Sequence, residues 1–256
     1  MPRAKRYHIP GYVWHITHRC HKREFLLKFV RDRRRWLHWL YEAKKRYGLR
    51  VLDYIVTSNH VHLLVEGAGD GAIYRSLQLV AGRTAQEFNM RKNRQSAFWH
   101  DRYHATAVET GQHLRQCIVY IDMNMVRAGV VDHPSEWETS GYNEIQKPKK
   151  RYRIVDRKRL RHLVGSDSGE HFCTAHEAWL AEALRSQQQK QRERIWTESI
   201  AVGSRSYVEN VKKELGFRVR ARKVENSGFG WVIREDTNPY GPVFQGQNET
   251  LSIKTS

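Results

Sequence analysis

The chain has 256 residues, of which 45 are Lys or Arg and 27 are Asp or Glu, so its formal net charge is +18. This excess of positive charge favours a polyanionic partner, and three cysteines far apart in the sequence exclude a disulfide framework and a cysteine-based zinc site. Apolar runs stay far below the ~20 residues of a membrane-spanning helix, and the basic N-terminus lacks the apolar core of a secretory signal, so we expect a cytoplasmic protein without a membrane partner.

Strands and helices are expected to alternate through the first half of the chain. Apolar and polar residues alternate in the strands, whereas apolar residues recur every three or four positions in the helices. Gly48 and Gly129 are suited to end two of the helices. The order of elements indicates the α+β class, with a ferredoxin-like βαββαβ core, an antiparallel sheet and one additional C-terminal helix. The expected strands cover residues 12–19, 49–56, 61–66 and 102–109, and the expected helices cover 29–47, a segment after 71, and 111–127.

The composition changes after the predicted core. Lys and Arg crowd the segment 146–165, so we expect a basic linker between a first domain over 1–145 and a small basic domain over 166–256. The small domain is predicted to combine helices and strands, because helical spacing is followed by two β-rich segments. The predicted helices lie near 175–184 and 206–215, and the predicted strands cover 217–225 and 229–235.

Two histidines, His60 and His62, lie in the second strand of the predicted hairpin. Because side chains alternate between the faces of a strand, both imidazoles point to one face, where two histidines at this spacing can chelate one metal ion. The same pattern also fits two histidines on an exposed sheet face. His15 and Thr17 of the first strand are expected to share that polar face and to support the histidines.

The last predicted helix presents Tyr120 and Asn124 on one face, together with Cys117 and Arg127. Phosphodiester cleavage requires a nucleophile, a metal ligand and a positive charge close together. This helix face offers a hydroxyl, an amide carbonyl and a cation for these three roles. An ordinary amphipathic helix with a half-buried tyrosine would show the same spacing. The sequence names no general base for a tyrosine whose ordinary pKa is about 10.

Four motifs follow one another along the first half of the chain. They are Pro2–Gly11, Ser58–Val65, Trp99–Tyr103 and Tyr120–Gly129. Together they resemble the REP-associated tyrosine transposases, a group of the single-tyrosine HUH transposase superfamily, whose name refers to repetitive extragenic palindromes. The resemblance covers roughly the first 140 residues, because all four motifs lie there in the order typical of the family.

The resemblance implies a metal-dependent reaction on single-stranded or hairpin DNA. His60, His62 and Asn124 would bind Mg²⁺ or Mn²⁺, and two imidazoles with an amide oxygen suit such an ion acting as a Lewis acid. Tyr120 would attack a scissile phosphate, forming a 5′-phosphotyrosine and a free 3′-hydroxyl that can reverse the step. Met125 departs from the proline that relatives commonly have after this asparagine.

The basic residues supply candidate DNA contacts. Lys5 and Arg6 are expected in an N-terminal arm that reaches the nucleic acid, and Arg102 and Arg127 are expected to face the scissile phosphate. The run 147–161 is expected to hold flanking hairpin DNA. We expect a monomer rather than a homodimer, because the additional C-terminal domain distinguishes this chain from dimeric insertion-sequence relatives.

Two alternative functions stay open at the level of the sequence. A domesticated, non-catalytic protein that binds repeat hairpins would share the basic charge, although the intact set of His, Tyr and Asn favours an enzyme. A metal-dependent hydrolytic nuclease would use water as its nucleophile and leave Tyr120 a structural role.

Overall fold

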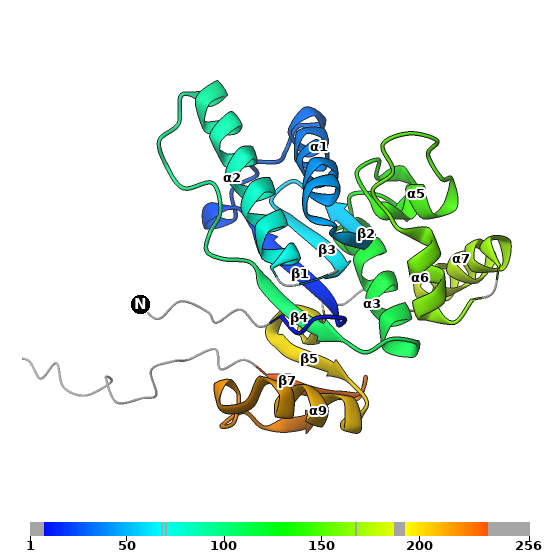
Figure 1. Cartoon of the computed structure of the whole chain (residues 1–256). Coiled ribbons are helices and arrows are strands. Elements are labelled where there is room, and N and C mark those ends of the chain that lie inside the picture. Colours follow the sequence, from blue (N-terminus) through cyan, green and yellow to red (C-terminus); the bar gives the residue numbers. More distant parts are fainter. Residues whose placement is uncertain (1–7, 68, 70, 167, 187–192, 235–256) are drawn as a thin grey trace, which may run out of the picture.

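The computed structural model describes residues 8–67, 69, 71–166, 168–186 and 193–234 (Figure 1). Its centre is a sheet of seven strands in the order β2-β3-β1-β4-β5-β7-β6. No helix among the described residues is long and apolar enough to cross a membrane. The strands are β1 (Val13–Arg19), β2 (Arg50–Val56), β3 (His60–Glu66), β4 (His104–Val108), β5 (Ser199–Gly203), β6 (Val224–Asn226) and β7 (Trp231–Arg234).

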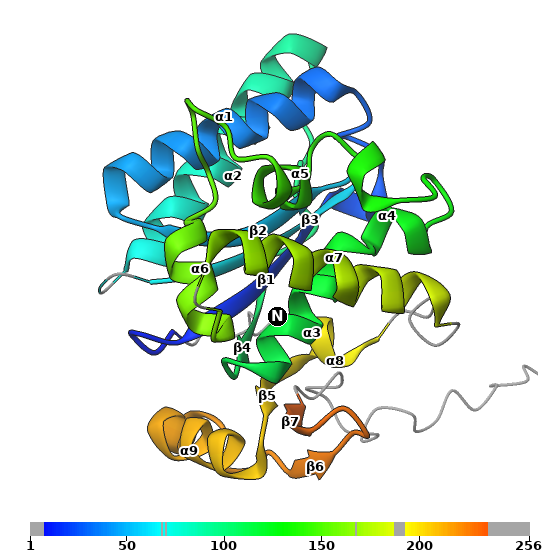
Figure 2. The ribbon, with the colours of Figure 1, turned by 90° about the vertical axis from the view of Figure 1, so that its right-hand side faces the viewer.

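The first four strands confirm the predicted ferredoxin-like core. β3 lies between β1 and β2 and is antiparallel to both, and β4 is antiparallel to β1. Figures 1 and 2 show α1 (Val30–Tyr47) and α2 (Ala72–Lys92) on one face of the sheet and α3 (Gln112–Asp122) on the other. Gly48 ends α1 at φ 68°, a left-handed conformation that glycine adopts without a Cβ penalty.

The last core helix is shorter than the sequence predicts. In place of one helix over 111–127, the chain bends at Met123 and continues as α4 (Asn124–Arg127). The Arg127 side chain reaches back over the bend, and its Nη2 donates to the Tyr120 carbonyl at 2.5 Å. A side chain that inserts into the hydrogen-bond ladder is a recognised cause of a helix break. The expected helix is therefore two segments joined by Arg127.

The C-terminal half extends the same sheet. β5 pairs in parallel with β4, β7 pairs with β5, and β6 pairs with β7, so the sheet is continuous across the boundary expected near residue 166. The segment 146–165, expected as a linker, contains a helix whose Leu160 and Val164 are buried. The helices here are α5 (Gly141–Gln146), α6 (Arg157–Val164), α7 (Gly169–Arg185), α8 (Ile195–Glu198) and α9 (Arg205–Leu215), and short 3-10 turns cover His21–Arg23, Pro134–Glu136 and Gly216–Arg218.

The start of α5 packs closely against β2. Asp53 is fully buried there, and its Oδ1 accepts a hydrogen bond from the Tyr54 backbone N–H at 2.8 Å. Burial is the main cause that raises the pKa of Asp53 well above its usual value, and the nearby Asp122 carboxyl raises it further. A Cβ at Gly141 would lie 2.1 Å from Asp53 Oδ1, so this contact requires glycine.

Gly141→Ala should therefore lower the free energy of unfolding by about 1–3 kcal/mol, because the methyl group overlaps a buried carboxyl group. Gly82→Ala is the matched control, because Gly82 lies at an exposed position of α2 and a Cβ there would have no atom within 4 Å. This variant should gain up to about 1 kcal/mol in the free energy of unfolding. Urea denaturation of both variants measures the difference. Equal stabilities would contradict the described packing.

Asp53→Asn should change how stability depends on pH. A carboxyl group whose folded-state pKa is raised stabilises the fold fully below about pH 4 and loses that contribution as pH rises towards the folded-state pKa. Relative to wild type, the variant should therefore gain up to about 1.4 kcal/mol per pH unit above about pH 4. Denaturant unfolding across this range measures the gain, and parallel curves for the two proteins would exclude the effect.

Candidate active site

His60 and His62 project from β3 towards the face of the sheet that α3 covers. In the β1–β3 register, Arg19 lies opposite His60 and Thr17 lies opposite His62. The two imidazole centroids are 5.0 Å apart with their planes at 80°. His62 is 1% exposed, whereas His60 is partly exposed. Alternation along the strand therefore brings both predicted ligands to one place, with His60 on its accessible side.

The residues of the β2–β3 turn orient the His60 ring. Its Nδ1 lies 2.7 Å from Asn59 Oδ1 and 3.0 Å from Thr57 Oγ1. The Thr57 hydroxyl donates its own proton to the His60 carbonyl at 2.8 Å, so both of these oxygens accept from the ring. The proton of neutral His60 therefore resides on Nδ1, which gives Nε2 the lone pair that a metal ion requires.

A second chain of hydrogen bonds orients the His62 ring. The Trp196 carbonyl can only accept, so His15 Nδ1–H donates to it at 2.8 Å. His15 Nε2 then accepts from His62 Nδ1–H at 2.9 Å, which leaves the lone pair of His62 on Nε2. Burial lowers the pKa of His15 to about 3 and lowers that of His62 well below its usual value, so both rings are neutral at neutral pH. His60 and His62 thus adopt the same tautomer.

Asn124 completes the donor set. Its Nδ2 lies 3.1 Å from His62 Nε2, so the amide already faces the lone pair. A half-turn of the amide exchanges nitrogen for oxygen at this position and supplies a carbonyl ligand. Among the described residues, no group of three or more His, Cys, Asp or Glu is arranged for a metal. The two imidazoles and this amide fit a divalent cation that keeps other positions for water or phosphate.

Tyr120 lies on α3 against these rings. Its ring centroid is 5.7 Å from that of His62 and 6.0 Å from that of His15, and both contacts are edge-to-face. The guanidinium of Arg127 lies 4.3 Å from the ring centroid. The guanidinium therefore makes a cation–π contact with the face of the phenol ring. The phenol is 4% exposed.

A groove of about 810 Å³ lies beside the histidines. Lys22 and Arg23 at its rim have φ values of 50° and 60°, which are uncommon for residues with a Cβ and mark local strain. The expected contact Arg102 lies in this groove, whereas Lys5 and Arg6 fall outside the described residues. The lining residues are Thr17, Arg19, Lys22, Arg23, His100, Asp101, Arg102, His104, Arg194, Thr197 and Glu198.

Sequence patterns reach some of these residues and miss others. Strand alternation correctly puts His15, Thr17 and Arg19 on the histidine face, although it does not by itself indicate that Arg19 lies opposite His60. Trp196 accepts the hydrogen bond with its backbone carbonyl, so the residue type gives no signal from which this role could be predicted. Arg194 carries no local signal either, because its position depends on how the C-terminal half folds back.

Comparisons with known proteins found one family model and solved structures that are similar to the chain. Residues 9–124 match the family model described as IS200-like transposase. A solved REP-associated tyrosine transposase bound to a REP hairpin is 20% identical, with a TM-score of 0.48 over 61% of this chain and 94% of that one. A candidate transposase from Deinococcus radiodurans R1 is 15% identical, with a TM-score of 0.34 over 46% of this chain and 92% of that one.

No curated protein matches the chain. The family match begins just before β1 and ends at Asn124, so it spans all four core strands, both histidines and the tyrosine helix. The match to the IS200-like transposase family therefore covers the part of the chain that holds this site.

Proposed function

We propose that this transposase cleaves and rejoins single-stranded, repeat-hairpin DNA through a 5′-phosphotyrosine intermediate. The observation that carries the proposal is the grouping of the Tyr120 ring with the imidazoles of His60 and His62 on one face of the sheet. A hydrolytic nuclease needs no tyrosine there, and a purely DNA-binding protein needs no matched imidazole tautomers. The grouping therefore favours a tyrosine strand transferase over both alternatives.

His60, His62 and Asn124 would hold the divalent cation, Mg²⁺ or Mn²⁺. When bound, such an ion polarises the scissile phosphate as a Lewis acid. The protein prepares the ligands in advance, because hydrogen bonds at both Nδ1 atoms fix the two rings in the ligating tautomer. No rotation of a ring or transfer of a proton is then required of the histidines.

Tyr120 would perform the covalent step. Its Oη attacks phosphorus, the bond from phosphorus to the 3′ oxygen breaks, and the proton lost by the phenol is balanced by the one gained at the 3′-hydroxyl. Arg127 would stabilise the phenolate from its position beside the ring. The phosphodiester energy is kept in the phosphotyrosine bond, so attack by a 3′-hydroxyl restores a DNA strand.

The groove of about 810 Å³ would bind the single strand that leads to this site. Arg19, Arg102 and Arg194 supply cations along it, as expected for a surface that follows a phosphate backbone. The exposed run 147–153 would hold the hairpin stem. Since Tyr120 faces histidines of its own chain, the site is complete in one copy, which supports a monomer.

Tyr120→Phe should abolish the covalent product. Wild type incubated with labelled hairpin DNA and Mn²⁺ should yield a protein-linked 5′ product on denaturing electrophoresis, and the variant should lose at least about 10³-fold in its rate of formation. Tyr74→Phe, an exposed tyrosine on α2, is the control and should retain the product. Persistent cutting by Tyr120→Phe would indicate a water-using nuclease, and DNA binding without any cutting would indicate a binding protein.

Arg102→Ala should weaken binding of single-stranded DNA and lower the dependence of affinity on salt. Loss of one phosphate contact reduces the slope of log K against log salt by about 0.7. Lys213→Ala, on the exposed face of α9 and outside the groove, should leave the slope unchanged. Fluorescence anisotropy over a series of salt concentrations measures both, and equal slopes for the two variants would place the strand elsewhere.

A further inference from the structure

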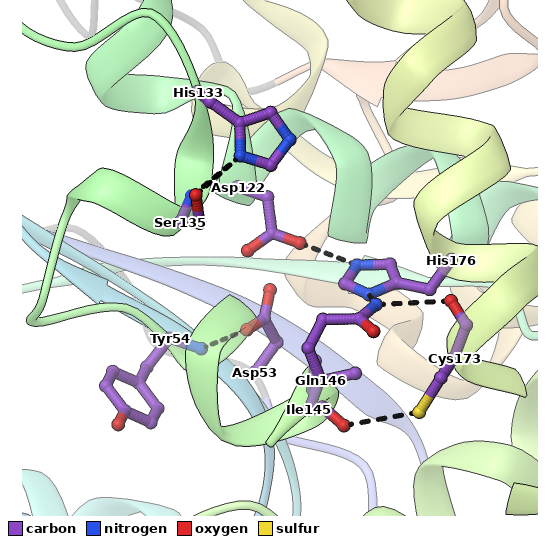
Figure 3. Close-up of polar contacts among 9 residues, drawn as sticks. All are labelled: Asp53, Tyr54, Asp122, His133, Ser135, Ile145, Gln146, Cys173 and His176. Atoms are coloured by element: carbon purple, nitrogen blue, oxygen red, sulfur yellow. Dashed lines mark hydrogen bonds and ion pairs between the residues drawn. The ribbon is translucent and has the colours of Figure 1, made fainter. Parts of the chain in front are cut away.

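A buried hydrogen bond joins α3 to α7. His176 Nε2 lies 2.8 Å from Asp122 Oδ2, and both side chains are fully buried (Figure 3). Asp122 is the last residue of α3, directly before the bend at Met123. Tyr120 precedes it by two residues and Asn124 follows it by two residues, so the contact lies midway between the proposed nucleophile and the proposed third ligand.

The surroundings fix the direction of this hydrogen bond. Gln146 Nε2 donates to His176 Nδ1 at 2.9 Å and also to the Cys173 carbonyl at 3.2 Å. Nδ1 is therefore the acceptor of the ring, and the ring proton resides on Nε2, from which it is donated to Asp122. Burial lowers the pKa of His176 to about 4, so the ring is neutral. Phe172 stacks on it with a centroid distance of 6.0 Å.

Aspartate is an unfavourable residue at this position. Burial raises the pKa of the Asp122 carboxyl well above its usual value, and the negative end of the α3 dipole disfavours the charged form further. Figure 3 shows the Asp53 side chain directed towards Asp122, and one oxygen of each, Asp53 Oδ2 and Asp122 Oδ1, has no hydrogen-bond partner within the described residues. A buried polar group that stability alone would not select is expected where function requires it. The hydrogen bond that Asp122 accepts from His176 is the contact that an apolar residue at this position could not make.

We propose that His176, acting through Asp122, is a positioning residue that holds the α3–α4 bend in place and thereby sets where Asn124 and Tyr120 lie relative to His60 and His62. The inference rests on the proposed function. It assigns α7, which lies outside the residues that match the family model, a direct part in building the site. Neither Asp122 nor His176 would touch DNA or metal.

The test measures Mn²⁺ binding to the full chain without DNA, by isothermal titration calorimetry, alongside covalent product formation and thermal unfolding. Asp122→Ala and His176→Phe each remove the hydrogen bond, and His176→Phe keeps an aromatic ring against Phe172. Each should raise the Kd for Mn²⁺ about tenfold. The double variant should be no weaker than either single one, because both remove the same contact.

Two controls separate positioning from general stability. Asp122→Asn retains an oxygen that accepts from His176 and should restore Mn²⁺ affinity to within about twofold of wild type. Asp32→Ala removes the Asp32–Arg91 ion pair between α1 and α2, on the opposite face of the sheet. It should lower the unfolding temperature without changing the Kd for Mn²⁺.

The outcomes distinguish this inference from the proposed function. Weaker Mn²⁺ binding in folded Asp122→Ala or His176→Phe, with recovery in Asp122→Asn, supports the positioning role. Wild-type Kd and product formation in both variants overturn it and leave the proposed function intact. A wild type that neither binds Mn²⁺ nor forms the covalent product overturns the proposed function, and the inference with it.

Discussion

The hydrogen-bond chain from the Trp196 carbonyl through His15 to His62 is the constraint on which the site depends. A carbonyl oxygen has no proton to give, so the direction of every donor along the chain follows from this one acceptor. The network is fully buried, where a missing partner is costly and a satisfied network specifies a unique arrangement. The position of the lone pair at His62 Nε2 is thus determined two hydrogen bonds away, at a backbone atom of the C-terminal half.

Interior positions on opposite sides of the sheet follow different rules. The face under α1 and α2 is apolar, with Trp36 and Leu40 fully buried, and contributes packing. The face under α3 carries His15, Thr17 and His62, which are polar and nearly inaccessible. Buried polar groups are tolerated when they are hydrogen-bonded, and the bonds of His15 and His62 order this layer before any ligand arrives.

Local sequence patterns were sufficient for the core and for its histidines. Strand periodicity correctly assigned His60 and His62 to one face of the sheet. The preference of glycine for a left-handed conformation correctly predicted that α1 ends at Gly48. The bend at Met123 was missed because the contact made there, from the Arg127 guanidinium to the Tyr120 carbonyl, leaves no trace in the periodicity of apolar residues. Pairing of β5 with β4 was missed because it joins segments about 90 residues apart, and such pairing depends on the whole fold.

The parallel pairing of β5 with β4 also limits how this molecule can be divided. Removal of everything after the family-matched segment would leave β4 as an open edge, with unpaired backbone groups available to another chain. The same cut would deprive His15 of its only described carbonyl acceptor. The family-matched core is therefore not an independent module, because the C-terminal half completes both its sheet and the hydrogen bonds of its site.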